Sequence, residues 1–342
     1  MEKKKIFNEH GIRGTESIIN GNTTNLREWN RIKYDWARTL YRTMLNNFWI
    51  PEEISLSEDV KQFPYLTDGE RNAFDKIISF LNFLDSIQSE NLPNISRYIT
   101  AAEVSSLLNI QAFQEEIHAQ SYSYILDTVT NPISRDKIYD QWREDEHLLH
   151  RNQFISNIYQ RFNEEPSQKH LIQVIVANYI LEGIYFYSGF SFFYTLARQG
   201  KMTATSTILK YINRDEITHL VLFQNIIKEL RNENKDLFTP ELEEEIREMM
   251  RTGVEHEIAW GQYVTNNQIL GINNELIDKY IKYLSNLRLR AIGIKELYPE
   301  VKEHPMSWID SFSNLNNTKT DFFEAKVTNY TKAAAYDFDD LE

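Results

Sequence analysis

The chain contains no cysteine among its 342 residues. Disulfides are therefore excluded, and any thiol chemistry must come from another molecule. Metal ligands, if there are any, must be histidine, aspartate or glutamate. Proline is also scarce, with eight residues that leave the tracts 167–239 and 241–298 free of it. Tracts of that length without proline can form uninterrupted helices.

An excess of basic charge is also missing, since the formal net charge is −13. A nucleic-acid surface needs a basic patch, and none is visible, so we expect no nucleic-acid partner. The basic start MEKKKIF is not followed by an apolar signal-peptide core. These absences predict a soluble, non-secreted protein that acts in the cytoplasm.

One long apolar run, residues 171–197, contains Glu182 as its only acid or base. The run is long enough to cross a membrane, but Gln173, Asn178 and Glu182 would be costly in lipid. We therefore expect a helix buried inside a helical bundle and no membrane association. Other helices are expected after Thr67, over about 100–128, over about 133–162, around 212–230, after Pro240 and over about 274–297.

The domain organisation follows from the same patterns. No linker rich in glycine, serine or proline divides the chain, so residues 1–314 are expected to form one domain with about 30 irregular residues at its start. Residues 315–342 are polar and end in YDFDDLE, which predicts a flexible C-terminal tail.

A small motif carries the chemistry: Glu115-x-x-His118 recurs as Glu216-x-x-His219. A glutamate and a histidine three residues apart share one helix face and can bind one ion. Two such helices, with one carboxylate from each of two others, form the dinuclear site of ferritin-like proteins. Asp85 and Glu182 are the candidates for those carboxylates because each stands among apolar residues. The fold expected is an all-α, ferritin-like bundle with a dinuclear carboxylate site.

The Glu-x-x-His motif also has less specific interpretations. Glu144-x-x-His147 also matches, but its charged setting indicates a solvated face. Tyr122 lies on the face of Glu115 and His118, although most tyrosines only pack in cores. A ferroxidase or metal-storage protein would use the same ligands without needing Tyr122. A di-metal oxygenase would need a substrate channel, and a purely structural bundle would leave Asp85 and Glu182 buried without a purpose.

Six longer motifs extend the pattern: FWIPEEI at 48–54, FLDSIQ at 83–88, EEIHAQSY at 115–122, LEGIYFYSGF at 181–190, INRDEITH at 212–219 and TDFFEAKVTNY at 320–330. Through these motifs the chain resembles, from about Phe48 onward, the small, radical-generating (beta) subunit of class I ribonucleotide reductase. Residues around 131–168 match only loosely. The resemblance implies a subunit of ribonucleoside-diphosphate reductase, an oxidoreductase that makes deoxyribonucleotides.

The resemblance also implies a role for individual residues. One metal would be bound by Asp85, Glu115 and His118, and the other by Glu182, Glu216 and His219, with Glu115 as a bridge. Tyr122 would carry a stable tyrosyl radical. The remaining roles are a radical pocket formed by Phe186, Phe190 and Ile212, a transfer chain of Trp49, Asp215 and His118, and a relay at Tyr330, or at Tyr336 if the tail alignment shifts.

The missing cysteines imply that this chain is not the whole enzyme, because ribonucleotide reduction needs thiols at the substrate. The resemblance implies a large catalytic (alpha) subunit, bound through the C-terminal tail, and a homodimer of the small subunit. Carboxylates and imidazoles suit iron and manganese equally. HAQSYS, FYSGF and NTKTDFF resemble the manganese branch with its flavodoxin-like activator, whereas SIQSEN after Asp85 resembles the iron branch.

Overall fold

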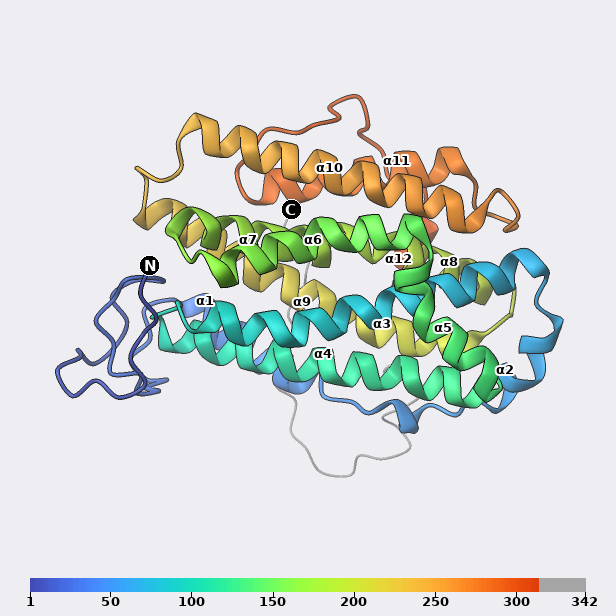
Figure 1. Cartoon of the computed structure of the whole chain (residues 1–342), viewed down its shortest axis with the longest axis horizontal. Coiled ribbons are helices and arrows are strands. Elements are labelled where there is room, and N and C mark those ends of the chain that lie inside the picture. The colour runs from blue at the N-terminus through green and yellow to red at the C-terminus, as the bar shows by residue number, and fades with distance from the viewer. Residues whose placement is uncertain (314–342) are drawn as a thin grey trace.

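A computed structural model describes residues 1–313 as a stack of long helices with an irregular N-terminal arm at one end (Figure 1). The predicted tail, including Tyr330 and Tyr336, lies outside the described residues. The α-helices are α1 (Asp35–Asn46), α2 (Ser57–Gln62), α3 (Asp68–Ser96), α4 (Ala102–Val129), α5 (Pro132–Glu144), α6 (Glu146–Glu164), α7 (Gln168–Ile180), α8 (Tyr187–Arg198), α9 (Thr203–Glu233), α10 (Pro240–Thr265), α11 (Asn274–Ala291) and α12 (Trp308–Ser313). Short 3-10 turns are η1 (Pro51–Glu53) and η2 (Phe63–Tyr65).

The start of α3 shows how the sequence sets a helix end. The Thr67 hydroxyl accepts the Glu70 N–H at 3.2 Å, and the Glu70 carboxylate accepts the Thr67 N–H at 2.9 Å. This reciprocal pair is a capping box, which satisfies two backbone donors that a helix start leaves free. Behind it Phe74, Ile77 and Leu81 are fully buried. The predicted helix after Thr67 is confirmed, and α4 matches the predicted 100–128 closely.

Three predicted helices are wrong in detail. The helix expected over about 274–297 ends at Ala291. The expected helix over 133–162 is broken at Asp145, whose backbone is extended and whose carboxylate accepts the N–H groups of His147 and Leu148. That capping starts a new helix, α6, so the segment forms α5 and α6. The apolar run 171–197 is also interrupted: α7 passes into a π-helix, η3 (Leu181–Tyr185), before α8 begins.

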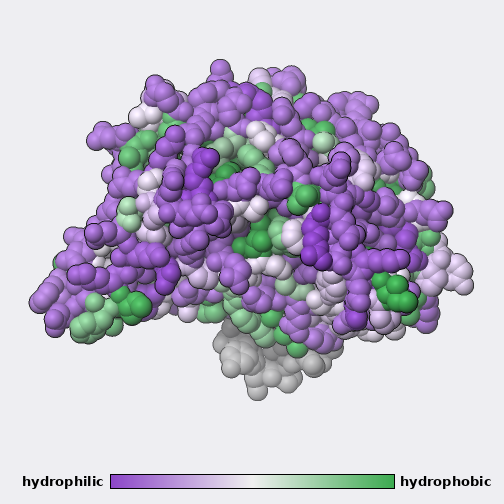
Figure 2. Space-filling view, in the orientation of Figure 1, coloured by the Kyte–Doolittle hydropathy of each residue, from purple (hydrophilic) through white to green (hydrophobic). Residues whose placement is uncertain are grey.

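The core of the bundle is formed by α3, α4, α9 and the α7–η3–α8 segment, and α10 and α11 lie along the opposite side from α4 (Figure 1). The stretch Gln168–Arg198 is apolar and long enough to span a membrane, but its most apolar window is entirely buried in the protein. The long apolar run is thus a core segment, as predicted. The face seen in Figure 2 is mostly hydrophilic, with small apolar patches.

A buried ion pair holds the junction between η3 and α8. Arg151 of α6 pairs with Glu257 of α10 and also donates to the Tyr185 carbonyl at 2.6 Å. Glu257 accepts the Ser188 N–H at 2.8 Å. A change of helix type disturbs the regular backbone hydrogen bonds, and here the ion pair supplies partners for one carbonyl and one N–H. Two outer helices thereby fix the segment that carries Glu182.

Candidate metal centre

Six acidic and imidazole side chains meet at the middle of the bundle. They come from four elements, and each is fully buried: Asp85 (α3), Glu115 and His118 (α4), Glu182 (η3), and Glu216 and His219 (α9). Their ligand atoms form two groups in which all atoms lie within 4.8 Å of one another. The sequence nominated these six residues, and the fold brings all of them together.

The first group is centred on His118. Its Nδ1 lies 3.0 Å from Glu216 Oε1, 3.4 Å from Glu115 Oε2 and 3.7 Å from Asp85 Oδ2. The second nitrogen, Nε2, points away toward Asp215 at 3.4 Å. Nδ1 is therefore the atom that faces the carboxylates, while Nε2 is held by a group behind the ring, an arrangement typical of metal-binding histidines.

The second group is centred on His219. Its Nδ1 lies 3.0 Å from Glu216 Oε2, 3.3 Å from Glu115 Oε1 and 3.6 Å from Glu182 Oε2. Its Nε2 is 3.0 Å from Gln114 Oε1. Glu115 and Glu216 each have one oxygen facing the first group and the other oxygen facing the second group. Both carboxylates therefore lie where they could bridge two ions. The sequence suggested a bridge by Glu115 alone.

The site fits a pair of metal ions because several of its ligand oxygens lack other partners. No hydrogen bond of good geometry reaches either oxygen of Asp85, Oε2 of Glu115, Oε2 of Glu182 or Oε1 of Glu216, and all are buried. Burial, followed by repulsion from Glu182 and Glu115, raises the pKa of Glu216 to about 8. Unpaired buried carboxylates cost several kcal/mol, and cations among them would remove that cost.

Behind the first group lies a chain of polar contacts that leads outward. Trp49 Nε1 donates to Asp215 Oδ2 at 2.8 Å, and the same oxygen is the one that faces His118. Arg214 Nε donates to the other oxygen of Asp215 at 3.1 Å. Burial alone would raise the pKa of Asp215, but His118 and Arg214 outweigh it and lower that pKa. The predicted trio of Trp49, Asp215 and His118 is therefore connected.

Tyr122 lies one helical turn beyond His118 and is fully buried. Its hydroxyl has no hydrogen bond of good geometry. Burial, and then the nearby Asp85 carboxylate, raise its pKa well above the usual value of 10. Phe186, Phe190 and Ile212 are buried as well, and the two phenylalanine rings stack with centroids 5.9 Å apart. Their role as a pocket around Tyr122 stays a prediction.

Four amide side chains around the ligands were not predicted from the sequence as part of the site. Gln114 contacts His219, and a second set bonds to the carboxylates: Gln88, Gln111 and Asn178. A sequence signal existed for two of them, since Gln111 and Asn178 stand four residues before Glu115 and Glu182 in apolar helices. By contrast, Glu144 and His147 are exposed and belong to different helices.

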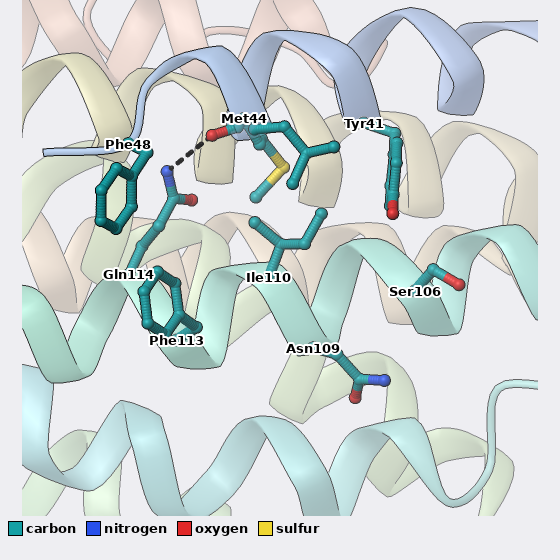
Figure 3. Close-up of a pocket in the computed structure, with 9 residues that line it drawn as sticks. Tyr41, Met44, Phe48, Ser106, Asn109, Ile110, Phe113 and Gln114 are labelled. Atoms are coloured by element: carbon teal, nitrogen blue, oxygen red, sulfur yellow. Dashed lines mark hydrogen bonds between the residues drawn. The ribbon is translucent and has the colours of Figure 1, made fainter.

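A surface groove of about 340 Å³ lies between α1 and α4 and reaches Gln114 (Figure 3). The rings of Phe48 and Phe113 stack at its edge, with centroids 6.2 Å apart. The Gln114 amide donates to the Met44 carbonyl at 3.5 Å while its oxygen faces His219. One amide group thus stands between this groove and the second ligand group.

The helical fold and the paired ligand groups define a ferritin-like protein with a dinuclear carboxylate site. The family model described as ribonucleotide reductase, small chain, matches residues 26–305. The chain therefore belongs to the small-chain family of ribonucleotide reductases, as the sequence motifs predicted. Neither the ferroxidase nor the oxygenase alternative gains support from these matches.

Individual relatives agree with this assignment. The ribonucleotide reductase R2 subunit from Clostridium botulinum is 82% identical, with a TM-score of 0.91 over 92% of this chain and 99% of that one. The ribonucleoside-diphosphate reductase subunit beta of Treponema pallidum (strain Nichols) is 50% identical over 100% of this chain and 98% of its own length. The dimanganese(II)-NrdF of Streptococcus sanguinis shares the fold, with 24% identity and a TM-score of 0.73 over 83% of this chain and 99% of that one.

Proposed function

We propose that the six buried ligands hold two ions of iron or manganese and that this centre serves to generate a radical on Tyr122. Asp85, Glu115 and His118 would hold one ion, and Glu182, Glu216 and His219 the other. The support is the convergence of buried carboxylate oxygens that have no other partner. When bound, the ions would supply the oxidising power, drawn from O2 or a related oxidant, for a one-electron oxidation of the phenol.

Tyr122 is suited to storing the oxidised state. Oxidation removes one electron and the phenolic proton, and the proton would pass to the nearby Asp85 carboxylate, whose charge helps to raise the pKa of the hydroxyl. Full burial keeps water and reductants from the ring. The proposed pocket of Phe186, Phe190 and Ile212 would add an apolar shield that offers no hydrogen atom as easily abstracted as that of a phenol.

The oxidising equivalent would leave through His118, Asp215 and Trp49. Trp49 is 5% exposed, so this chain of contacts ends close to the surface. We propose that Tyr330 in the tail is the next relay, with Tyr336 as the alternative. The partner is the large subunit, which must supply the thiols because this chain has no cysteine.

Three further proposals concern the setting of the enzyme. Docking to the large subunit would use the C-terminal tail, and a flavodoxin-like activator would serve a manganese-loaded centre. The small subunit would be a homodimer, the state typical of the family, and would act in the cytoplasm. The ligand set suits both metals, so the choice between iron and manganese is left to measurement.

The test is metal loading followed by electron paramagnetic resonance spectroscopy. The metal-free chain is loaded separately with Fe²⁺ and O2, and with Mn²⁺ and a reduced flavodoxin-like activator under O2. We expect two ions per chain, as the two ligand groups provide, and a tyrosyl radical signal with at least one metal. A chain that binds both metals fully yet gives no organic radical in either case would contradict the proposed role of Tyr122.

A further inference from the structure

Glu182 is held through only one of its carboxylate oxygens. Its Oε1 accepts N–H groups from Gln88 at 2.5 Å, Gln111 at 2.8 Å and Asn178 at 3.2 Å. Its Oε2 has no hydrogen bond and lies 3.6 Å from His219 Nδ1. The three amides and the carboxylate are buried, so water does not replace these bonds. The carboxylate is therefore locked with one oxygen toward the amides and the other toward the ligand group.

The Gln88 amide is also held by a residue further out. The Tyr159 hydroxyl donates to Gln88 Oε1 at 2.5 Å, which turns Nε2 toward Glu182. Nε2 donates its second hydrogen to Asn178 Oδ1 at 2.9 Å. A flipped Gln88 amide would place its carbonyl oxygen against two other oxygens, those of Glu182 and Asn178. Tyr159 is 7% exposed and forms the surface end of this network.

We infer that Tyr159 is a positioning residue for the metal centre: through Gln88 it holds Oε1 of Glu182 on the amides, so that Glu182 offers Oε2 alone to its ion. The inference rests on the proposed role of Glu182 as a ligand. It gives α6, which supplies no ligand, a part in setting the coordination. Without the phenol hydroxyl, Gln88 is held less firmly, and Glu182 loses part of the support that keeps its Oε2 turned toward the ion.

The test uses the full-length chain, prepared free of metal and titrated with Co²⁺, whose visible absorption reports the coordination geometry. The variant Tyr159→Phe removes one hydroxyl and keeps the ring. Tyr179→Phe is the matched control, because Tyr179 is also a buried tyrosine and its hydroxyl donates to the Arg288 carbonyl at 2.9 Å, outside the network. Thermal unfolding of the metal-free forms shows whether either change disturbs the fold.

We expect Tyr159→Phe to weaken one of the two Co²⁺ sites by about 10-fold or more and to change the visible spectrum, in line with the usual effect of removing a group that orients a ligand. The other site and the unfolding temperature should stay as in the control. Unchanged affinity and spectrum in Tyr159→Phe would overturn the inference, as would an equal change in Tyr179→Phe.

A second variant tests the route through Gln88. Gln88→Leu should weaken the same site, and adding Tyr159→Phe to it should have no further effect, because the two residues act in series. Full additivity would overturn the inference. Glu182→Ala distinguishes the ligand role of Glu182 from the positioning role of Tyr159. If it binds two Co²⁺ ions as tightly as the unaltered chain, the proposed ligand assignment fails; if it loses one ion while Tyr159→Phe is silent, only the positioning role fails.

Discussion

Tyr122 combines three properties that bear on a stored radical: full burial, a hydroxyl without a good hydrogen bond, and a pKa raised by burial and Asp85. The raised pKa keeps the phenol protonated at any physiological pH. Oxidation must therefore remove the proton together with the electron.

Changing Tyr122→Phe should leave metal binding intact, since the ring still fills its site and no ligand is touched. The tyrosyl signal should vanish, and reductase activity with the large subunit should fall to background. Electron paramagnetic resonance and a coupled reductase assay measure both. Tyr124→Phe, on the same helix, is the control, because its hydroxyl only donates to the Ile54 carbonyl. Persistent activity in Tyr122→Phe would mean that the oxidising equivalent is stored elsewhere.

Glu216 and His219 should differ in their effect on loading, although they are three residues apart. Glu216 belongs to both ligand groups and His219 to one. We therefore expect His219→Ala to lose the ion on its own side and Glu216→Ala to impair both. Metal analysis per chain gives the result, circular dichroism checks that the helices remain, and Glu144→Ala serves as an exposed control. Normal loading in both variants would refute the ligand assignment.

Among the residues of the site, the ligands could be predicted from the sequence, but the amide side chains that contact them could not. A repeated Glu-x-x-His and two isolated acids in apolar runs are rare enough to stand out. Amides are not, because Gln and Asn occur on many helices for many reasons, and nothing local shows that Gln88 of α3 meets Asn178 of α7. The bridging place of Glu216 is likewise a property of the assembled fold. It depends on how α4 and α9 pack, to within an ångström or so.

Among the helices, the π-helix η3 was the least predictable element. Its sequence LEGIY continues the apolar run on both sides, and a π-turn leaves no mark in hydrophobic periodicity. The break at Asp145 was readable in principle, since an aspartate before Glu146 is a helix-capping residue. The long helices α3 and α10 were predictable because each has a capping threonine, Thr67 or Thr239, ahead of its apolar residues. The helices α4 and α9 begin without a side-chain cap, so only their apolar residues could indicate them.

The buried ion pair between Arg151 and Glu257, which holds the junction between η3 and α8, leads to a prediction about stability. Changing Arg151→Met should leave Glu257 buried without its partner, and breaking a buried pair in this way costs about 3–5 kcal/mol. Urea unfolding of the metal-free chain measures the change. Arg143→Met, which removes an exposed pair with Asp140, should cost less than about 1 kcal/mol. A loss for Arg151→Met as small as that of the control would show that the junction is held by packing alone.

For the whole molecule, the decisive question is how the chain meets its large subunit. The tail beyond residue 313 lies outside the described residues, and we propose that Phe338 and Leu341, near its acidic end, bind a groove on the large subunit as apolar anchors. Deleting 331–342 should abolish binding to the large subunit while the metals and the Tyr122 radical remain. Binding assays on the truncated chain measure this, and a peptide of the last dozen residues should compete with the full chain.

Tyr330→Phe is the counterpart of that deletion. It should keep binding and stop turnover, because the docking anchors remain while the proposed relay is lost. Tyr336→Phe tests the alternative relay in the same assay. Full turnover by the truncated chain at ordinary subunit concentrations would remove the tail from the docking role altogether.

The complete burial of all six ligands has a consequence for how the centre acquires its metal. An ion can enter or leave only when the structure opens locally, whether helices separate or a side chain such as Gln114 moves aside, and openings of a protected core are rare. The residence time of a bound ion is then set by the opening rate and not by its affinity alone. If the site binds both iron and manganese, the metal it carries would depend on which ion was available when the protein folded around it.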